Sequence, residues 1–209
     1  MIFHDWMYLV IVCILGAFSP GPSLMVILSI TSSFGRESGI FASLGHGFAV
    51  FIYALISATG LSVLINANEN LMIYIQILGA AFLLYLALRI YISLFFFEKK
   101  FAEPDQNVKL GNHFRDGFLL AILNPKIAAF FLALFSQFLQ SDQTLSVHLL
   151  MAAIAGIIDT FAYIFVVFWA STAIIQKFIL KNKKLIDLVF ASILSFLSLS
   201  LFVNSIGYI

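Results

Sequence analysis

The stretch WMYLVIVCILGAFSPGPSLMVILSI at residues 6–30 combines a long apolar run with two prolines around a glycine. At a rise of about 1.5 Å per residue, a helix of this length crosses the roughly 30 Å hydrocarbon core of a bilayer. A proline inside a helix removes a backbone hydrogen bond, so Pro20-Gly21-Pro22 predicts a break near the middle. In lipid the freed backbone groups are costly unless they face protein, water or a ligand. A kink that serves packing alone remains the alternative at this point.

Five further apolar runs follow, at residues 39–65, 71–97, 115–139, 148–174 and 185–207. They are long and continuous, whereas the strands of a membrane barrel are short and alternate between apolar and polar residues. A cleaved signal peptide would carry a positively charged N-terminal region, which is missing here, so we expect the first run to be retained. The sequence therefore predicts an all-α integral membrane protein with six transmembrane helices in one domain, residues 1–209.

The composition agrees with a lipid environment. Of the 209 residues, 62% are hydrophobic and 10% are charged, and the mean hydropathy is +1.07. Soluble domains average about 25% charged residues and cannot hide so much apolar surface at this size. The net charge of +1 gives no reason to expect nucleic acid. No zinc, P-loop or dinucleotide motif is present, so we predict no metal, no cofactor and no catalytic residue.

Lysine and arginine occur on one side of the predicted helices. They lie between the first and second runs (Arg36), the third and fourth (Lys99, Lys100, Lys109, Arg115), and the fifth and sixth (Lys177, Lys181, Lys183, Lys184). The other connections and both ends carry none. Positive residues favour the cytoplasmic side of short loops. We therefore expect these three connections in the cytoplasm and both termini outside.

Three predicted helices precede a long polar linker at about 98–112, and three follow it. Because three is odd, the halves at about 1–97 and 113–209 would have opposite orientations. FSPGPS at 18–23 corresponds to LNPKIA at 123–128, and FIY at 51–53 is a weaker echo of FAY at 161–163. Interrupted helices at matching positions are typical of transporters built from inverted repeats. We predict a 3+3 inverted repeat with Pro-broken helices 1 and 4.

Three ionisable residues fall deep inside predicted helices. Asp159 and Lys126 are near mid-membrane, where charged groups usually face a cavity or a partner. His46 is the third, and the imidazole changes its charge near neutral pH, which suits proton transfer. The alternatives are an Asp159–Lys126 structural ion pair and a histidine that only packs. Cys13 lies in an apolar run and is expected to be a plain buried thiol.

Two other arrangements have less support in the sequence. Small residues at 35, 39, 43 and 47 recur every four positions, which favours close helix packing over ligand contact. Ser19, His46 and Asp159 have the residue types of a hydrolase triad, but no nucleophile-elbow signature accompanies them. An intramembrane enzyme and a non-transporting scaffold or assembly subunit stay as alternatives.

Several of these runs resemble the LysE/RhtB family of amino-acid exporters. They are GAFSPGPSLMVILS at 16–29, LGAAFLLYLALR at 78–89 and GFLLAILNPKIAAFFLALFSQF at 117–138. The resemblance covers nearly the whole chain, and PGP and LNPK are its most specific marks. It implies a bacterial inner-membrane exporter of amino acids or similar small metabolites, driven by the proton gradient. Many members have an acidic residue near the position of Val50, so here His46 or Asp159 would have to serve instead.

The expected mechanism is electrostatic. Half-helices that begin after Pro22 and Pro125 present positive dipole ends to a substrate carboxylate, and Lys126 adds a full charge. Asp159 would receive the substrate ammonium or a proton in competition. The predicted substrate-binding residues are Ser19, Pro20, Gly21, Pro22, Asn124, Pro125, Lys126, Asp159 and Tyr163, with Asp159 and His46 for proton coupling. The expected partners are an amino acid, protons and the lipid bilayer, and a homo-oligomer stays open.

Overall fold

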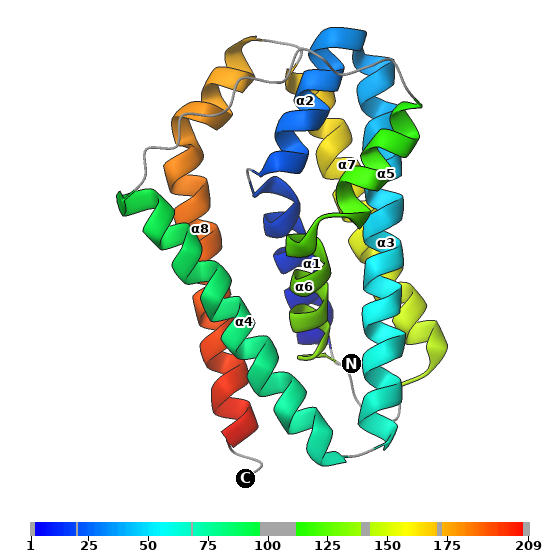
Figure 1. The fold of residues 1–209 in the computed structure, drawn as a ribbon, viewed down its shortest axis with the longest axis vertical. Coiled ribbons are helices and arrows are strands. Elements are labelled where there is room, and N and C mark those ends of the chain that lie inside the picture. The colour runs from blue at the N-terminus through cyan, green and yellow to red at the C-terminus, as the bar shows by residue number, and fades with distance from the viewer. Residues whose placement is uncertain are drawn as a thin grey trace.

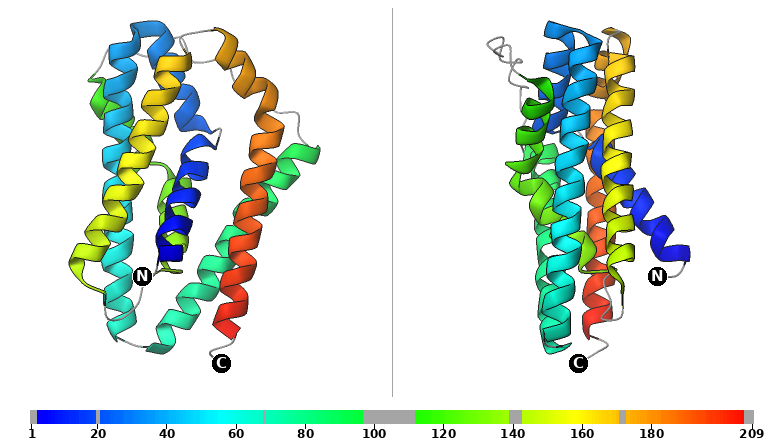
Figure 2. Two further views of the ribbon diagram at one scale, coloured as in Figure 1. Left: turned by 180° about the vertical axis from the view of Figure 1, so that it is seen from behind. Right: turned by 90° about the vertical axis from the view of Figure 1, so that its right-hand side faces the viewer.

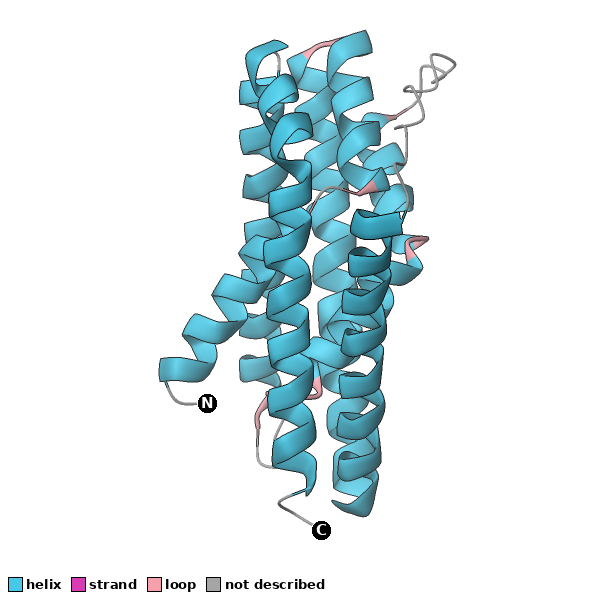
Figure 3. Ribbon diagram, turned by 90° about the vertical axis from the view of Figure 1, so that its left-hand side faces the viewer, coloured by secondary structure: helices cyan, strands magenta, loops and turns pink. Residues whose placement is uncertain are grey.

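The computed structural model describes residues 3–19, 21–67, 69–96, 112–138, 143–170 and 173–206. These residues form helices joined by short connections, with no strand among them (Figure 3). The helices are α1 (Phe3–Phe18), α2 (Pro22–Phe34), α3 (Arg36–Ala67), α4 (Glu69–Phe96), α5 (His113–Ile122), α6 (Pro125–Phe135), α7 (Leu145–Ala170) and α8 (Ala173–Ile206). The predicted all-α class is therefore confirmed. The linker at 98–112 falls almost entirely outside the described residues.

Three helical stretches are long and apolar enough to cross a membrane: Arg36–Val63, Gln76–Leu94 and Leu145–Trp169. Two pairs of shorter helices pass the same test together, α1 with α2 and α5 with α6, so the count reaches five if each bent pair is one span. In α8 the apolar part, Asp187–Ser200, is shorter. The sixth predicted span therefore stays a prediction.

One predicted loop is wrong. The polar stretch KFILKNKK at 177–184 should separate two helices, but α8 runs without interruption from Ala173 to Ile206. The stretch contains no glycine or proline, and leucine and lysine are good helix formers, so polarity alone does not end the helix. By contrast, α2 does end at a glycine, Gly35. Its φ of +89° suits glycine, and its N–H bonds to the Thr31 carbonyl.

The helices form two groups that lie side by side. α3 packs on α7 and α5, and α4 packs on α8 to one side of that bundle (Figures 1 and 2). The ends that carry Arg36, Arg115 and the start of α8 lie toward the same end of the molecule in Figure 1. The connection from α3 to α4 and the C-terminal end of α8 lie at the opposite end. The ends that carry these described basic residues thus lie toward one end of the molecule, while their orientation in a membrane stays a prediction.

Small residues let α3 approach its neighbours closely. A Cβ on Gly47 would collide with Thr160 and with the Gly156 carbonyl on α7, and a Cβ on Gly45 would collide with the Phe114 carbonyl on α5. Gly39 similarly faces Thr31. The packing interpretation of the small-residue stripe is thus confirmed at positions 39 and 47. Gly35 is different, because a Cβ there would meet nothing within 4 Å.

Candidate functional site

Two broken helices supply the centre of the candidate site. The α1–α2 pair bends by 56° at the break between Phe18 and Ser23, and the α5–α6 pair bends by 58° at the break between Ile122 and Pro125. At the second break the Asn124 side chain caps α6 by accepting a hydrogen bond from the Lys126 N–H at 3.0 Å. At the first break Gly21 is the N-cap of α2, and no side chain caps it. The two half-helices therefore differ in how their N-terminal N–H groups are satisfied.

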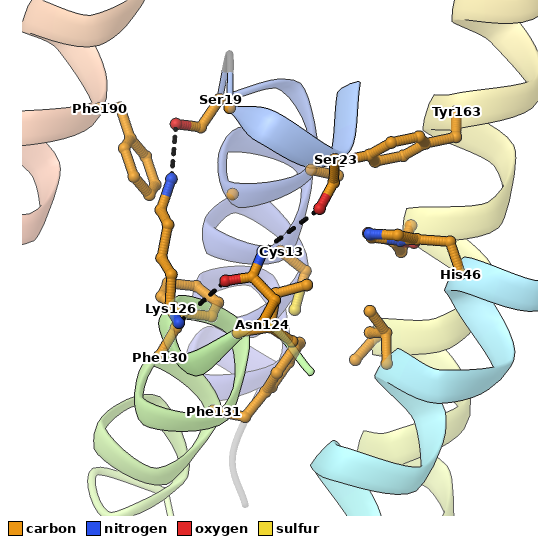
Figure 4. Close-up of a pocket in the computed structure, with 17 residues that line it drawn as sticks. Cys13, Ser19, Ser23, His46, Asn124, Lys126, Phe130, Phe131, Tyr163 and Phe190 are labelled. Atoms are coloured by element: carbon orange, nitrogen blue, oxygen red, sulfur yellow. Dashed lines mark hydrogen bonds and ion pairs between the residues drawn. The ribbon is translucent and has the colours of Figure 1, made fainter. Parts of the chain in front are cut away.

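Two hydrogen bonds join the breaks across the molecule (Figure 4). The Asn124 amide Nδ2 donates to Ser23 Oγ at 3.2 Å, and Lys126 Nζ donates to Ser19 Oγ at 3.3 Å. Lys126 Nζ also lies 5.3 Å from the centre of the Phe190 ring on α8, within cation–π range. The two segments that the sequence matches at Pro20 and Pro125 are thus joined by hydrogen bonds in the structure.

A second polar pair lies on the facing helices α3 and α7. His46 Nδ1 and Asp159 Oδ2 are 2.7 Å apart, and only 1% and 7% of these residues are exposed. The Tyr163 ring stacks on the imidazole, with centroids 4.5 Å apart and an interplanar angle of 24°. Among the described residues, His46 Nε2 has no hydrogen-bond partner. A buried nitrogen of this kind is available to a ligand or a water molecule.

The structure gives Asp159 and Lys126 different partners. Asp159 pairs with His46, whereas Lys126 contacts Ser19 and Phe190. The alternative of a direct Asp159–Lys126 ion pair is therefore wrong for this structure. The hydrolase-triad alternative also lacks its first contact, because the Ser19 hydroxyl bonds to Lys126 and not to His46. Metal-binding groups of three or more His, Cys, Asp or Glu residues are absent from the described part of the chain.

These groups surround one cavity. Its volume is about 60 Å³, counted as the space that the centre of a water molecule can reach. The lining residues are Cys13, Gly16, Ala17, Ser19, Gly21, Ser23, His46, Val50, Asn124, Lys126, Ile127, Phe130, Phe131, Ala155, Asp159, Tyr163 and Phe190. The polar ones cross its middle, from Lys126 on one side to His46 on the other (Figure 4). The Lys126 ammonium and the Asp159 carboxylate thus lie in opposite walls of this small cavity, which we also call the chamber.

Most of the predicted site residues line this cavity. Ser19, Gly21, Asn124, Lys126, Asp159, Tyr163 and His46 all do. Pro125 begins α6 but is exposed and is not among the lining residues. Pro20 lies outside the described residues, and nothing is described of the Pro22 side chain.

Sequence reasoning missed part of the lining. Ser23 directly follows the broken segment, so it could have been found by extending the motif by one residue. Phe130, Phe131 and Phe190 gave no signal, because the chain contains 24 phenylalanines and most suit a lipid-facing surface equally well. Cys13 is buried, as predicted, but it also lines the cavity.

Comparison with known proteins supports the resemblance. A family model described as LysE type translocator matches residues 14–205. An uncharacterized membrane protein of Pseudomonas aeruginosa is 30% identical over 125 residues, covering 57% of this chain and 56% of that protein. An uncharacterized membrane protein of Bacillus subtilis is 27% identical over 161 residues, covering 71% of this chain and 75% of that protein.

A leucine efflux protein of Salmonella typhimurium is 30% identical over 139 residues, covering 66% of this chain and 64% of that protein. The matched part of this chain thus spans just over half of the Pseudomonas protein and just under two thirds of the Salmonella protein. No solved structure matches. The family model covers nearly the whole length of the chain, and the apolar spans and broken helices agree with a membrane protein. This chain therefore belongs to the LysE type translocator family of membrane proteins.

Proposed function

We propose that this protein exports amino acids from the bacterial cytoplasm across the inner membrane in exchange for protons. The observation that carries the proposal is the chamber at the two helix breaks, with Lys126 and Asp159 in opposite walls. A free amino acid is a zwitterion, so one amine and one carboxylate of the protein complement its two charges. The family match and the similarity to leucine efflux proteins support the same function.

The substrate carboxylate would bind Lys126 and Asn124. Both donors now bond to serine hydroxyls, and a carboxylate is a stronger acceptor than a neutral hydroxyl. The N-terminus of α2 adds a positive dipole end without a capping side chain. Four of the predicted binding residues, Pro20, Gly21, Pro22 and Pro125, would act by forming the breaks. Ser19 would accept the Lys126 hydrogen bond when no substrate is bound, and Tyr163 would form part of the opposite wall.

The substrate ammonium would bind Asp159 and compete there with a proton. His46 already contacts the Asp159 carboxylate, so a proton held by the imidazole could leave when the substrate ammonium binds there. Binding of one would weaken binding of the other, which is the condition for exchange of substrate against protons. The His46–Asp159 pair would take the place of the acidic residue that relatives have near Val50.

We further propose a 3+3 inverted repeat for this family member. α1–α2 and α5–α6 run in opposite directions in Figure 1, as do α3 and α7. The elements that the repeat would relate, α3 with α7 and α4 with α8, also pack on each other, which a two-fold axis between halves would produce. Tyr53 of α3 donates to the Ile122 carbonyl at the end of α5, while Tyr163 of α7 lies beside Ser23 at the start of α2 (Figure 4).

An efflux screen tests the function. Cells that lack other exporters are loaded with dipeptides, and each amino acid is measured outside, with and without the protein and with and without an uncoupler. We expect faster appearance of at least one amino acid, sensitive to the uncoupler. A scaffold or assembly subunit predicts no difference for any amino acid, and that result would overturn the proposal. Export that persists with the uncoupler would overturn the proton-exchange part alone.

A further inference from the structure

The charged side chains of the cavity are few and already assigned. Among the described lining residues, Lys126, Asp159 and His46 are the titratable groups apart from Cys13 and Tyr163. Under the proposed function, the main-chain carboxylate and ammonium of the substrate use Lys126 and Asp159. A third charge on the substrate side chain would then lie against apolar groups, with no further opposite charge among the lining residues, which is unfavourable.

The remaining wall is apolar. Val50, Ile127, Phe130, Phe131 and Phe190 line it, together with Cys13 and three small residues, Gly16, Ala17 and Ala155. Phe130 and Phe131 meet edge to face with centroids 5.2 Å apart, and Phe131 lies below the labelled polar residues in Figure 4. An aliphatic side chain placed there leaves water for an apolar surface, and each added methylene strengthens binding by roughly fourfold.

The size of the cavity favours small substrates. A volume of about 60 Å³ on this measure has room for roughly four to six water molecules. The Phe130 ring closes one end, since its tip lies only 3.2 Å from where a Cβ on Gly16 would be. Because the cavity must also hold the amine and the carboxylate of the substrate, a compact side chain fits this space better than a bulky bicyclic one.

From these observations we infer that the cavity selects amino acids with uncharged aliphatic side chains over basic and acidic ones. The inference rests on the proposed function and narrows it to a substrate class. One wall of the chamber binds the common zwitterionic part of an amino acid. The other wall, built by α1, α3, α6, α7 and α8, distinguishes among side chains by burying them without a charged partner among the lining residues.

The test compares rates for a panel in one assay. Purified protein in liposomes is given external labelled leucine and a proton gradient, and unlabelled leucine, isoleucine, valine, methionine, lysine, arginine, glutamate or tryptophan is added as competitor. We expect the four aliphatic amino acids to compete at least about tenfold better than lysine, arginine or glutamate. Competition by lysine or arginine as strong as that by leucine would overturn the inference, while the proposed function would stand. No transport of any amino acid would overturn both.

A substitution pair tests the apolar wall itself. Val50→Asp adds a carboxylate to it, and Val50→Asn is a control of nearly the same shape without the charge. We expect Val50→Asp to change the ratio of leucine to lysine transport by about tenfold in favour of lysine, and Val50→Asn to slow leucine without admitting lysine. An unchanged ratio in a folded Val50→Asp protein would contradict the inference. If that variant does not fold, the competition panel on the unmodified protein decides.

Discussion

His46 on α3 and Asp159 on α7 are joined by a 2.7 Å contact between Nδ1 and Oδ2, at a level where the two helices touch. The neighbouring Gly47 leaves no room for a Cβ against Gly156 and Thr160, so the polar pair and the close helix contact depend on each other. A shift of α3 against α7 would therefore change the environment of the buried Asp159 carboxylate in the cavity wall. Under the proposed function, movement of these helices and proton binding would be coupled at this contact.

The first prediction concerns Asp159→Asn. The amide keeps the shape and a hydrogen bond to His46 but cannot ionise, so we expect an inserted, folded protein that no longer couples export to the proton gradient. Replacement of a charge-assisted bond by a neutral one costs about 1 kcal/mol of stability, too little to unfold the protein. Asp159→Glu should retain part of the activity. Gradient-driven efflux and melting in detergent are the two measurements.

The double mutant with Lys126→Met provides the control for Asp159→Asn. Because Asp159 bonds to His46 and Lys126 bonds to Ser19, removal of the lysine charge should restore neither stability nor export. Recovery of both in the double mutant would show that the two residues form an ion pair in the working protein, and it would remove the direct role of Asp159.

The second prediction uses two asparagines that cap helices. Asn124 caps α6 and also reaches Ser23, whereas Asn112 caps α5 through the Arg115 N–H and is not a lining residue. Each change to alanine should cost about 1 kcal/mol of stability through the lost cap. Export should fall at least about tenfold in Asn124→Ala alone. Equal loss of export in both variants would indicate a general helix effect and not a binding role.

The third prediction concerns the first helix break. With Pro20, Gly21 and Pro22 all changed to alanine, the backbone can continue as one helix, because alanine restores the missing donors and has high helix propensity. We expect normal membrane insertion and no export. Expression, resistance to extraction and leucine efflux are measured together. Normal export by the triple-alanine protein would mean that the break near Ser19 has no part in transport.

The fourth prediction compares two glycines of α3. A Cβ on Gly47 would collide with Thr160 and the Gly156 carbonyl, while a Cβ on Gly60 would meet nothing within 4 Å. Gly47→Ala should therefore destabilise the protein by about 1–3 kcal/mol and impair export through displacement of His46. Gly60→Ala should leave the melting temperature unchanged or raise it slightly. Similar melting of the two variants would contradict the close contact between α3 and α7.

The fifth prediction concerns orientation. In a Cys13→Ser background, a thiol placed at Asn68 should react with an impermeant reagent added outside the cell, and a thiol at Asn182 should not. The reason is the one-sided distribution of lysine and arginine. Strong labelling at 182 with none at 68 would reverse the assignment.

The sequence was sufficient for the helical class and for much of the cavity. Long apolar runs require helices in lipid, and prolines within them require breaks, so both follow from backbone chemistry. Asp159, Lys126 and His46 stood out because charge inside an apolar run is costly and therefore rare. Their depth could be predicted from their position along the helix, since each residue adds a fixed rise.

The pairing of these groups could not be predicted. Whether Asp159 meets Lys126 or His46 depends on the rotation and crossing of separate helices, which small residues such as Gly47 determine through contacts with another segment. The same holds for Phe130, whose place in the cavity wall depends on tertiary packing that its residue type does not reveal. Charged residues between two apolar runs favour a loop at 177–184, but lysine and leucine also sustain a helix, so composition alone does not distinguish the two.

The bonds from Lys126 to Ser19 and from Asn124 to Ser23 have a consequence for how the protein responds to supply. In the empty cavity, Lys126 and Asn124 each already donate to a serine hydroxyl, so an arriving carboxylate competes with these hydroxyls for the same donor groups. Such built-in competition lowers affinity without lowering the maximum rate. Under the proposed function, weaker binding raises the substrate concentration that half-saturates the protein, so the rate of export would keep rising as the cytoplasmic pool grows.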